Sequence, residues 1–258
     1  MLLLSTSSLT GYGLHRVFCF AKEAGYEGID IALGMLNFDL WDSEYILELS
    51  KNFNIPVISL TAPGKDMSQK KLDSIMDMAE VLESEVVTFS PPHFMDKDTK
   101  WFGDPLKKLQ KDSSIEICIQ NVESKYLFFV IPEYRNATLG KIKTVTGKTT
   151  LDVTAIDSST TMDIMRAQAE LGRSLQNIFF ADRLSSQRGL LPGSAGASLS
   201  HLPLESFLMK LKSSNYEGHF TIKVSPKEMG VGDANDVINK LIYIKKYYEK
   251  HFLYYKND

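Results

Sequence analysis

Eight short apolar segments alternate with amphipathic helix patterns along all 258 residues of the chain. The segments are rich in Ile, Val, Leu and Phe without strict polar alternation, which is typical of strands buried on both faces. They cover residues 2–6, 28–33, 56–61, 86–90, 115–120, 149–153, 178–182 and 220–224. Because parallel strands need crossover connections, the alternation predicts a parallel sheet, and eight such units close into a barrel.

Between these segments the apolar residues recur with the helical period. Leu14, Val17, Phe18 and Ala21 fall on one helix face, and Gly25 is expected to end that helix. Similar spacing predicts helices over residues 43–53, 72–82, 101–111, 139–145, 160–171, 204–211 and 237–248. An open, doubly wound sheet is the alternative, but no glycine-rich phosphate motif follows the first strand. We therefore expect an α/β fold, a single (β/α)8 TIM barrel, with residues 1–258 as one domain.

Charge and hydropathy argue against nucleic acid and membrane as partners of this chain. The net charge of −3 and a pI near 6.0 argue against nucleic-acid binding by bulk charge, since phosphate neutralisation needs a basic surface. No apolar run is long enough to cross a bilayer, so no membrane partner is expected. Cys19 and Cys118 each lie in an apolar run and are expected to be small core residues. This pattern suits a reducing cytoplasm.

In a (β/α)8 barrel, chemistry takes place where strands end and the following loops begin. Polar residues at the predicted strand ends are therefore the candidates for a site. They are Ser5 to Ser8, Asp30, Thr61, Ser90 to His93, Gln120, Asn121, Glu123, Asp152, Thr154, Asp182, Arg183, Lys223 and Ser225.

Three stretches of the chain resemble the xylose-isomerase-like superfamily. They are the opening Ser5-Thr6-Ser7-Ser8-Leu9 with the later run of residues 21–31, the loop Leu191-Pro192-Gly193-Ser194-Ala195-Gly196, and Asn215-Tyr216-Glu217-Gly218 before the last strand. Their order and spacing extend over nearly the whole chain. The superfamily includes sugar isomerases, sugar epimerases and apurinic-site nucleases of the endonuclease IV type. The resemblance implies the same barrel fold and chemistry at the strand ends.

The resemblance also implies a divalent metal held by carboxylates and histidine, but this sequence departs from that pattern. Where the superfamily has Glu, this chain has Gln120 and Lys223, and where the superfamily has His, it has Ala155 and Phe179. The two Asp positions of the superfamily pattern are kept as Asp152 and Asp182. An ammonium ~4 Å from a cation costs about 4 kcal/mol per unit charge at an effective dielectric of 20. We therefore expect no metal of the family type and no cofactor. A displaced metal on Gln120, Asp152 and Asp182 is the alternative.

Lys223 is open to three interpretations. It neutralises Asp152 or Asp182 in place of the cation, it forms a cationic floor for an acidic ligand, or it forms a Schiff base with a carbonyl substrate. Arg183 and Arg188 precede the small-residue loop around Gly193, and these are features of an anion site. A surface loop with solvated arginines is the alternative.

The remaining candidates are assigned by their position at the strand ends. Lys223, His93 and Glu123 are the predicted catalytic residues, with Asp30 as a further acid–base group. The predicted substrate-binding residues are Gln120, Asn121, Asp152, Asp182, Arg183, Arg188 and Gly193. Of these, Gln120 and Asn121 are suited to hydrogen bonding with sugar hydroxyls.

The favoured function is that of a divergent sugar or sugar-phosphate isomerase or epimerase that works without the usual metal. Its expected partner is a small molecule, namely a sugar, a sugar phosphate or an organic acid. Two alternatives stay open, a non-catalytic barrel that senses a metabolite and an apurinic-site endonuclease. The tyrosine-rich tail, residues 243–255, either packs as a helix face or supports a homodimer contact.

Overall fold

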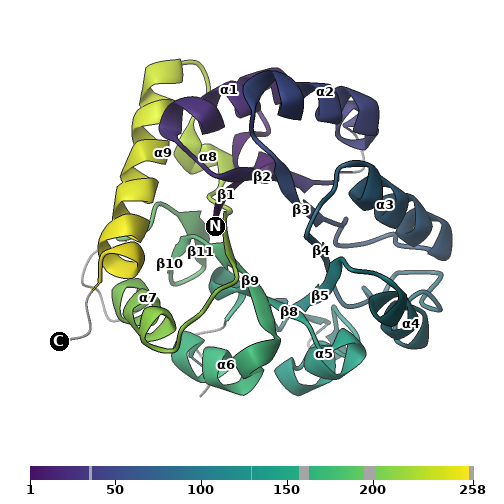
Figure 1. The fold of residues 1–258 in the computed structure, drawn as a ribbon. Helices are drawn as coiled ribbons and strands as arrows, with labels where there is room; N and C mark the ends of the chain where they lie inside the picture. The colour runs from purple at the N-terminus through teal and green to yellow at the C-terminus, as the bar shows by residue number, and fades with distance from the viewer. Residues whose placement is uncertain (35–36, 129, 157–162, 195–201, 256–258) are drawn as a thin grey trace.

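The computed structural model describes residues 1–34, 37–128, 130–156, 163–194 and 202–255. Eight parallel strands close into a barrel in the order β1-β2-β3-β4-β5-β8-β9-β12 (Figure 1). These strands are β1 Leu2–Ser5, β2 Gly28–Ala32, β3 Val57–Thr61, β4 Val86–Phe89, β5 Glu116–Gln120, β8 Thr149–Asp152, β9 Leu175–Phe180 and β12 His219–Ile222. The predicted (β/α)8 barrel is confirmed.

Helices surround the barrel and cover the outer face of its strands (Figure 1). They are α1 Leu14–Ala24, α2 Ser43–Phe53, α3 Gln69–Val81, α4 Asp104–Asp112, α5 Leu139–Thr146, α6 Ile164–Leu171, α7 Leu204–Ser213, α8 Pro226–Met229 and α9 Ala234–Tyr248. Short 3-10 turns are η1 Thr6–Leu9, η2 Phe38–Trp41, η3 Val153–Ala155 and η4 Gly172–Ser174, and a π-helical turn, η5 Glu249–Leu253, follows α9. As predicted, α1 ends at Gly25, which has a left-handed φ of 72°.

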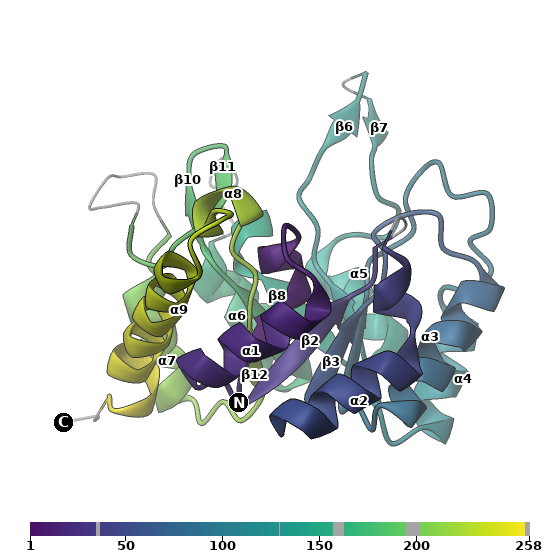
Figure 2. The ribbon, with the colours of Figure 1, turned by 90° about the horizontal axis from the view of Figure 1, so that it is seen from above.

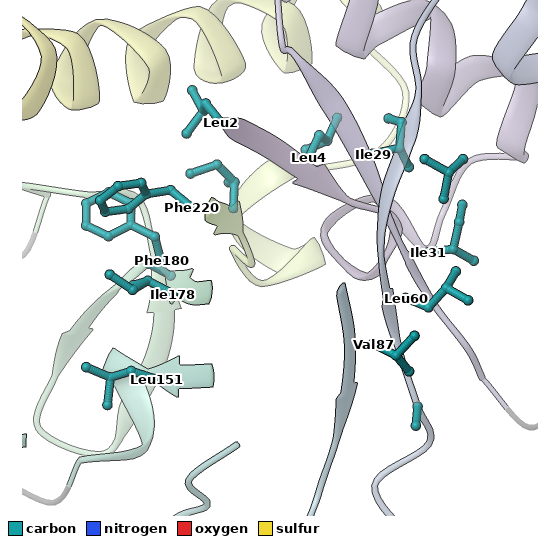
Figure 3. Close-up of a cluster of buried hydrophobic side chains, with 14 of the residues drawn as sticks. Leu2, Leu4, Ile29, Ile31, Leu60, Val87, Leu151, Ile178, Phe180 and Phe220 are labelled. Carbon is teal, nitrogen blue, oxygen red and sulfur yellow. The ribbon is translucent and has the colours of Figure 1, made fainter. Parts of the chain in front are cut away.

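The main hydrophobic core lies between the barrel wall and the helices. Leu4, Ile31, Leu60, Ile178 and Phe220 belong to this cluster, and each is fully buried (Figure 3). Truncating such a residue to alanine costs about 2–5 kcal/mol, because lost burial and a cavity act together. This layer holds the strands in place and so fixes the positions of the residues at their ends.

Polar side chains line much of the inside of the barrel, in contrast to its outer wall. The hydroxyls of Thr88 and Thr150 lie 2.8 Å apart, and Thr221 donates to the amide oxygen of Asn177 at 3.0 Å. Residues two apart on a strand share one face, so the inward face continues toward the strand ends. Its next members are Asp152 after Thr150, Phe179 after Asn177, and Lys223 after Thr221.

Two antiparallel hairpins stand at the carboxyl end of the barrel (Figure 2). One consists of β6 Tyr126–Leu127 and β7 Ile131–Pro132, and the other of β10 Asp182–Leu184 and β11 Gln187–Leu190. Neither hairpin is predicted by the sequence pattern. The predicted end of the seventh barrel strand at Asp182 is wrong, because that strand is β9 and ends at Phe180.

Within the described residues, no helix is both long enough and apolar enough to cross a bilayer.

Candidate functional site

Two cavities open at the carboxyl end of the barrel, with volumes of about 340 Å³ and 360 Å³. Asp152, Arg188 and Lys223 line both of them, so the two cavities meet at these three side chains. A larger hollow of about 670 Å³ lies at the opposite end, beside Glu116 and His219, which begin β5 and β12. Barrels of this architecture place their chemistry at the carboxyl end, so the paired cavities are the candidate site.

Asp30 of β2 is fully buried just inside the barrel mouth. Ser5 donates a hydrogen bond to one of its carboxylate oxygens at 2.6 Å, and Thr61 donates to the other at 2.8 Å. Burial raises the pKa of Asp30, while the charge of Lys223 and the hydroxyl donors act in the opposite direction. Asp30 is therefore a carboxyl group held in place by its neighbours and electrostatically linked to Lys223.

Lys223 follows β12, and its ammonium nitrogen lies 3.9 Å from the centre of the Phe179 ring. In the described part of the chain, no carboxylate oxygen comes within the 4.0 Å of this nitrogen that defines an ion pair. Burial lowers the pKa of Lys223, although Asp152 and Asp30 oppose that shift, and the charge of Arg188 adds to it. Lys223 thus faces both cavities as a cation without an ion-pair partner among the described residues.

A second group of charges surrounds Glu123, and its members are paired with one another. Arg183 lies 3.1 Å from one Glu123 oxygen, while Arg188 at 3.3 Å and Lys125 at 2.9 Å approach the other. Arg188 also reaches Asp152 at 2.9 Å. Burial alone would raise the pKa of Glu123, but the Lys125 hydrogen bond and the arginine charges outweigh it, so the pKa is lowered. Glu123 is therefore held as a carboxylate.

Arg183 is committed to holding the protein together at this end of the barrel. Its guanidinium donates to the backbone oxygens of Ser185 at 2.6 Å, Thr154 at 2.9 Å and Ile156 at 3.0 Å, in addition to Glu123. Its side chain is only 8% exposed. These bonds tie the β10–β11 hairpin to the turn after β8, and they direct the guanidinium at protein acceptors.

Gln120 and Asn121 both line the 340 Å³ cavity, as their place at the end of β5 predicts. The Asn121 side chain accepts from the Asp152 backbone N–H at 2.7 Å and donates to the Asp152 carbonyl at 3.0 Å. Gln120 donates to the hydroxyl of Ser90. Asn121 thus links β5 to the end of β8, whereas Gln120 presents its amide to the cavity.

His93 contacts the site through a residue that the sequence analysis missed. Its Nε2 lies 3.5 Å from Glu133, and its Nδ1 accepts from the Met95 backbone N–H at 3.2 Å, which places the ring proton on Nε2. Glu133 and Tyr134 line the 340 Å³ cavity, whereas His93 packs against the Tyr134 ring behind them. Glu133 directly follows β7 in the arm after β5, far from the end of any barrel strand, so only its pairing with a strand-end histidine could have pointed to it.

Asp182 and Gly193 lie away from both cavities. The Asp182 carboxylate accepts from the Gly193 backbone N–H at 2.9 Å, and Tyr243 of α9 donates to the Pro192 carbonyl at 2.9 Å. Gly193 has a φ of +76°, and a Cβ there would meet the Tyr247 ring at 2.7 Å. The described part of this loop is therefore docked on α9, while its residues 195–198 lie outside the described residues.

Comparison with known proteins bears on the fold. No protein-family model matches the chain. Uncharacterized proteins of Mycobacterium bovis and Mycobacterium tuberculosis are 26% identical over 128 residues, which is 46% of this chain and 45% of theirs. The chain thus spans about half the length of the curated relatives it matches.

Solved structures match over almost the full chain. A family 2 AP endonuclease from Brucella melitensis has a TM-score of 0.71 at 14% identity, covering 95% of this chain and 98% of that one. The 3-keto-D-glucoside 4-epimerase of E. coli scores 0.66 at 12% identity with the same coverage. A xylose isomerase domain protein of Alicyclobacillus acidocaldarius scores 0.67 at 17% identity, covering 98% of this chain and 99% of that one. The chain has the (β/α)8 barrel fold of the xylose-isomerase-like type.

Proposed function

We propose that this barrel binds a small hydroxylated carbonyl metabolite that carries a carboxylate or phosphate, and isomerises or epimerises it without a divalent metal. The observation that carries the proposal is the position of Lys223. Its ammonium lines both mouth cavities and has no ion-pair partner among the described residues. A fixed cation at this place attracts an anionic group and polarises a carbonyl oxygen, which are the tasks a metal performs elsewhere.

The side chains at the mouth do not fit a divalent cation. Among the described residues, no group of three or more His, Cys, Asp or Glu side chains is arranged to hold a metal. Asp152 is paired with Arg188, Phe179 offers a phenyl ring, and Lys223 brings a positive charge. The alternative metal site on Gln120, Asp152 and Asp182 gains no support, since Asp182 is directed at Gly193 instead.

Glu133 supplies the proton-transfer group in this proposal. Its carboxylate lines the same 340 Å³ cavity as Lys223, and His93 sits behind it at 3.5 Å. Isomerisation or epimerisation beside a carbonyl removes a proton from one carbon and returns a proton to the substrate. Lys223 would stabilise the negative charge that develops on the carbonyl oxygen, while Gln120 at the cavity wall hydrogen-bonds a substrate hydroxyl.

The non-catalytic sensing barrel is retained as the second candidate because of one observation. Glu123, which follows β5, and Asp152, the last residue of β8, are already neutralised by Arg183 and Arg188. A site whose charges are paired in advance is suited to holding a ligand, and not to exchanging protons with it. Under this alternative, Lys223 binds an anion and Glu133 takes no part in chemistry.

Elemental analysis of the purified chain, followed by thermal-shift titration, tests the binding half of the proposal. The titration uses Mg²⁺, Mn²⁺, Zn²⁺ and a panel of sugar phosphates and hydroxy or keto acids. A ligand at 100 times its Kd stabilises the native state by about 2.7 kcal/mol. We expect no stoichiometric metal and a shift from one of the anionic compounds. That shift is lost in Lys223→Met and kept in the matched variant Lys227→Met, which removes an exposed lysine of α8.

Proton exchange in D₂O separates an isomerase from a sensor. NMR of the compound that gives the shift should show deuterium entering at the carbon beside the carbonyl, and Glu133→Gln should abolish this. Binding without exchange would leave the sensing barrel as the function. Stoichiometric metal, or a large shift caused by metal alone, would overturn the metal-independent site.

A further inference from the structure

The surroundings of Lys223 are those of an amine that can act as a nucleophile. Its nitrogen opens to both mouth cavities, one face of it is covered by the Phe179 ring at 3.9 Å, and no described carboxylate pairs with it. Lysines become nucleophiles when limited hydration or a neighbouring cation favours the uncharged amine, and Arg188 is such a cation here. Burial lowers the pKa of Lys223, which increases the fraction of free amine.

Other lysines of the barrel do not share these surroundings. Lys125, at the mouth, is 60% exposed and lies 2.9 Å from Glu123, and Lys148, at the opposite end of the barrel, is 2.9 Å from Glu116. The remaining cations of the mouth, Arg183 and Arg188, have guanidinium groups, which stay protonated. Lys125 also lines the 340 Å³ cavity, but its amine is paired with Glu123. Among the described residues that line the two cavities, Lys223 is therefore the amine without an ion-pair partner.

We propose that Lys223 forms a covalent imine with the carbonyl carbon of an aldehyde or ketone that also carries a carboxylate or phosphate. The inference rests on the proposed function, because it assigns the same ligand class to the same cavity. It goes further because Lys223 becomes a catalytic residue that forms a covalent bond with the substrate carbon. The proposed function requires only electrostatic contact between them.

The step balances without an oxidant or a further reactant. The free amine attacks the carbonyl carbon, the new C–N bond forms, and the carbonyl electron pair moves to oxygen. That oxygen takes up two protons, one released when the ammonium became the free amine and one lost from the nitrogen after the C–N bond formed. The C–O bond then breaks, the oxygen leaves as water, and the nitrogen lone pair forms the C=N bond. The product is a protonated imine, so the positive charge stays above the Phe179 ring and near Asp30 and Asp152. The electrostatic neighbours of the ammonium are thus also neighbours of the iminium.

Borohydride trapping of the full chain tests the imine. The protein is incubated with dihydroxyacetone phosphate or with pyruvate, treated with sodium borohydride, and analysed by intact mass and by peptide mapping. Hydride reduces the iminium to a secondary amine, so the expected gain is the mass of the probe less one oxygen atom, located on Lys223. Lys223→Arg keeps the charge but cannot form the imine, so it should lose the adduct, while Lys227→Arg keeps it.

Thermal shifts with the same probes distinguish the failure of this inference from the failure of the proposed function. A shift without a trapped adduct overturns the imine and leaves anion binding in place. An adduct spread equally over surface lysines also overturns it. The absence of both shift and adduct overturns both statements for these compounds. Mapping of the wild-type adduct needs no variant, so the result does not depend on whether Lys223→Arg folds.

Discussion

Two groups of charged side chains share the mouth of the barrel, yet they are built in opposite ways. Around Glu123, the cations Arg183, Arg188 and Lys125 all lie within 3.3 Å of its carboxylate. Around Lys223, Asp30 and Asp152 act on the ammonium only through longer-range electrostatic attraction. Lys223 forms no ion pair with the described residues. The first group is closed by its own pairs, whereas the second is open to the cavities.

This difference separates a structural role from a reactive one. The Arg183 guanidinium donates hydrogen bonds to three backbone carbonyls and to Glu123, so we expect its removal to reduce the stability of the fold. The Lys223 ammonium donates no hydrogen bond to an oxygen of the described residues, so we expect its removal to reduce ligand binding and reaction rate. Asp152 belongs to both groups, because it pairs with Arg188 and also lines both cavities beside Lys223.

Replacing Arg183 is the strongest way to break the closed group. Arg183→Ala leaves the partly buried Glu123 carboxylate and three carbonyl oxygens with fewer partners. A buried acceptor that loses its hydrogen bond costs about 1–3 kcal/mol, and the carbonyls of Thr154 and Ile156 are such acceptors. We expect a loss of at least that size in the free energy of unfolding in urea. Lys223→Met should cost less, because no ion pair is broken and Asp30 can take up a proton.

The exposed Arg173→Ala serves as the control for loss of one arginine, and surface changes of this kind stay within about 0.5 kcal/mol. A loss in Lys223→Met equal to that in Arg183→Ala would contradict the distinction between the two groups. It would mean that Lys223 holds the barrel mouth together as firmly as the arginine does.

The pH dependence of borohydride trapping tests whether the Lys223 amine has a lowered pKa. Only the free amine attacks a carbonyl, so the rate of adduct formation rises about tenfold per pH unit below the amine's pKa. Burial lowers the pKa of Lys223, with Asp152 and Asp30 opposing and Arg188 adding to the shift. The rise should therefore level off below 10.5, the ordinary value for lysine. N-α-acetyl-lysine, measured beside the protein, should rise up to that value, and an identical profile for both would contradict a lowered pKa.

The fold was predictable because its signal repeats along the chain. Each barrel strand is a short apolar run, and a one- or two-residue error at its end leaves the count of eight unchanged. The exception is informative: the run 178–182 predicted a strand ending at Asp182, whereas β9 begins at Leu175 and ends at Phe180. Polar Gln176 and Asn177 hid the start of β9, since Asn177 faces the polar interior, where Thr221 donates to it.

The candidate site was only partly predictable, for a related reason. Asp152, Gln120 and Lys223 were placed at the mouth because they close strands, and strand ends follow from the pattern. Glu133 lies in the arm that carries β6 and β7, and its position depends on how that arm folds back, which no periodicity encodes. Asp182 and Gly193 shared a loop with the arginines in sequence, but hydrogen bonding to each other and packing on α9 direct them elsewhere.

The smallest expected effect concerns the acid side of the closed group. Glu123 has a lowered pKa, so its ionised form stabilises the fold above its ordinary value of 4.5, and this contribution is lost as pH falls through the folded-state pKa. Glu123→Gln does not titrate. The difference in unfolding free energy between wild type and Glu123→Gln should therefore be largest near neutral pH and shrink below pH 4.5.

Glu48→Gln, on the exposed side of α2, controls for the loss of one surface carboxylate. Partly exposed ion pairs contribute about 0.2–1 kcal/mol each, so the neutral-pH difference for Glu123→Gln should reach the upper part of that range. Lys125→Met should reduce the acid dependence of the wild type, because the Lys125 hydrogen bond is the leading cause of the lowered pKa. A difference that grows as the pH falls would require Glu123 to be protonated in the native state. Lys125, Arg183 and Arg188 would then lack a negatively charged partner in Glu123, and the contrast with Lys223 would disappear.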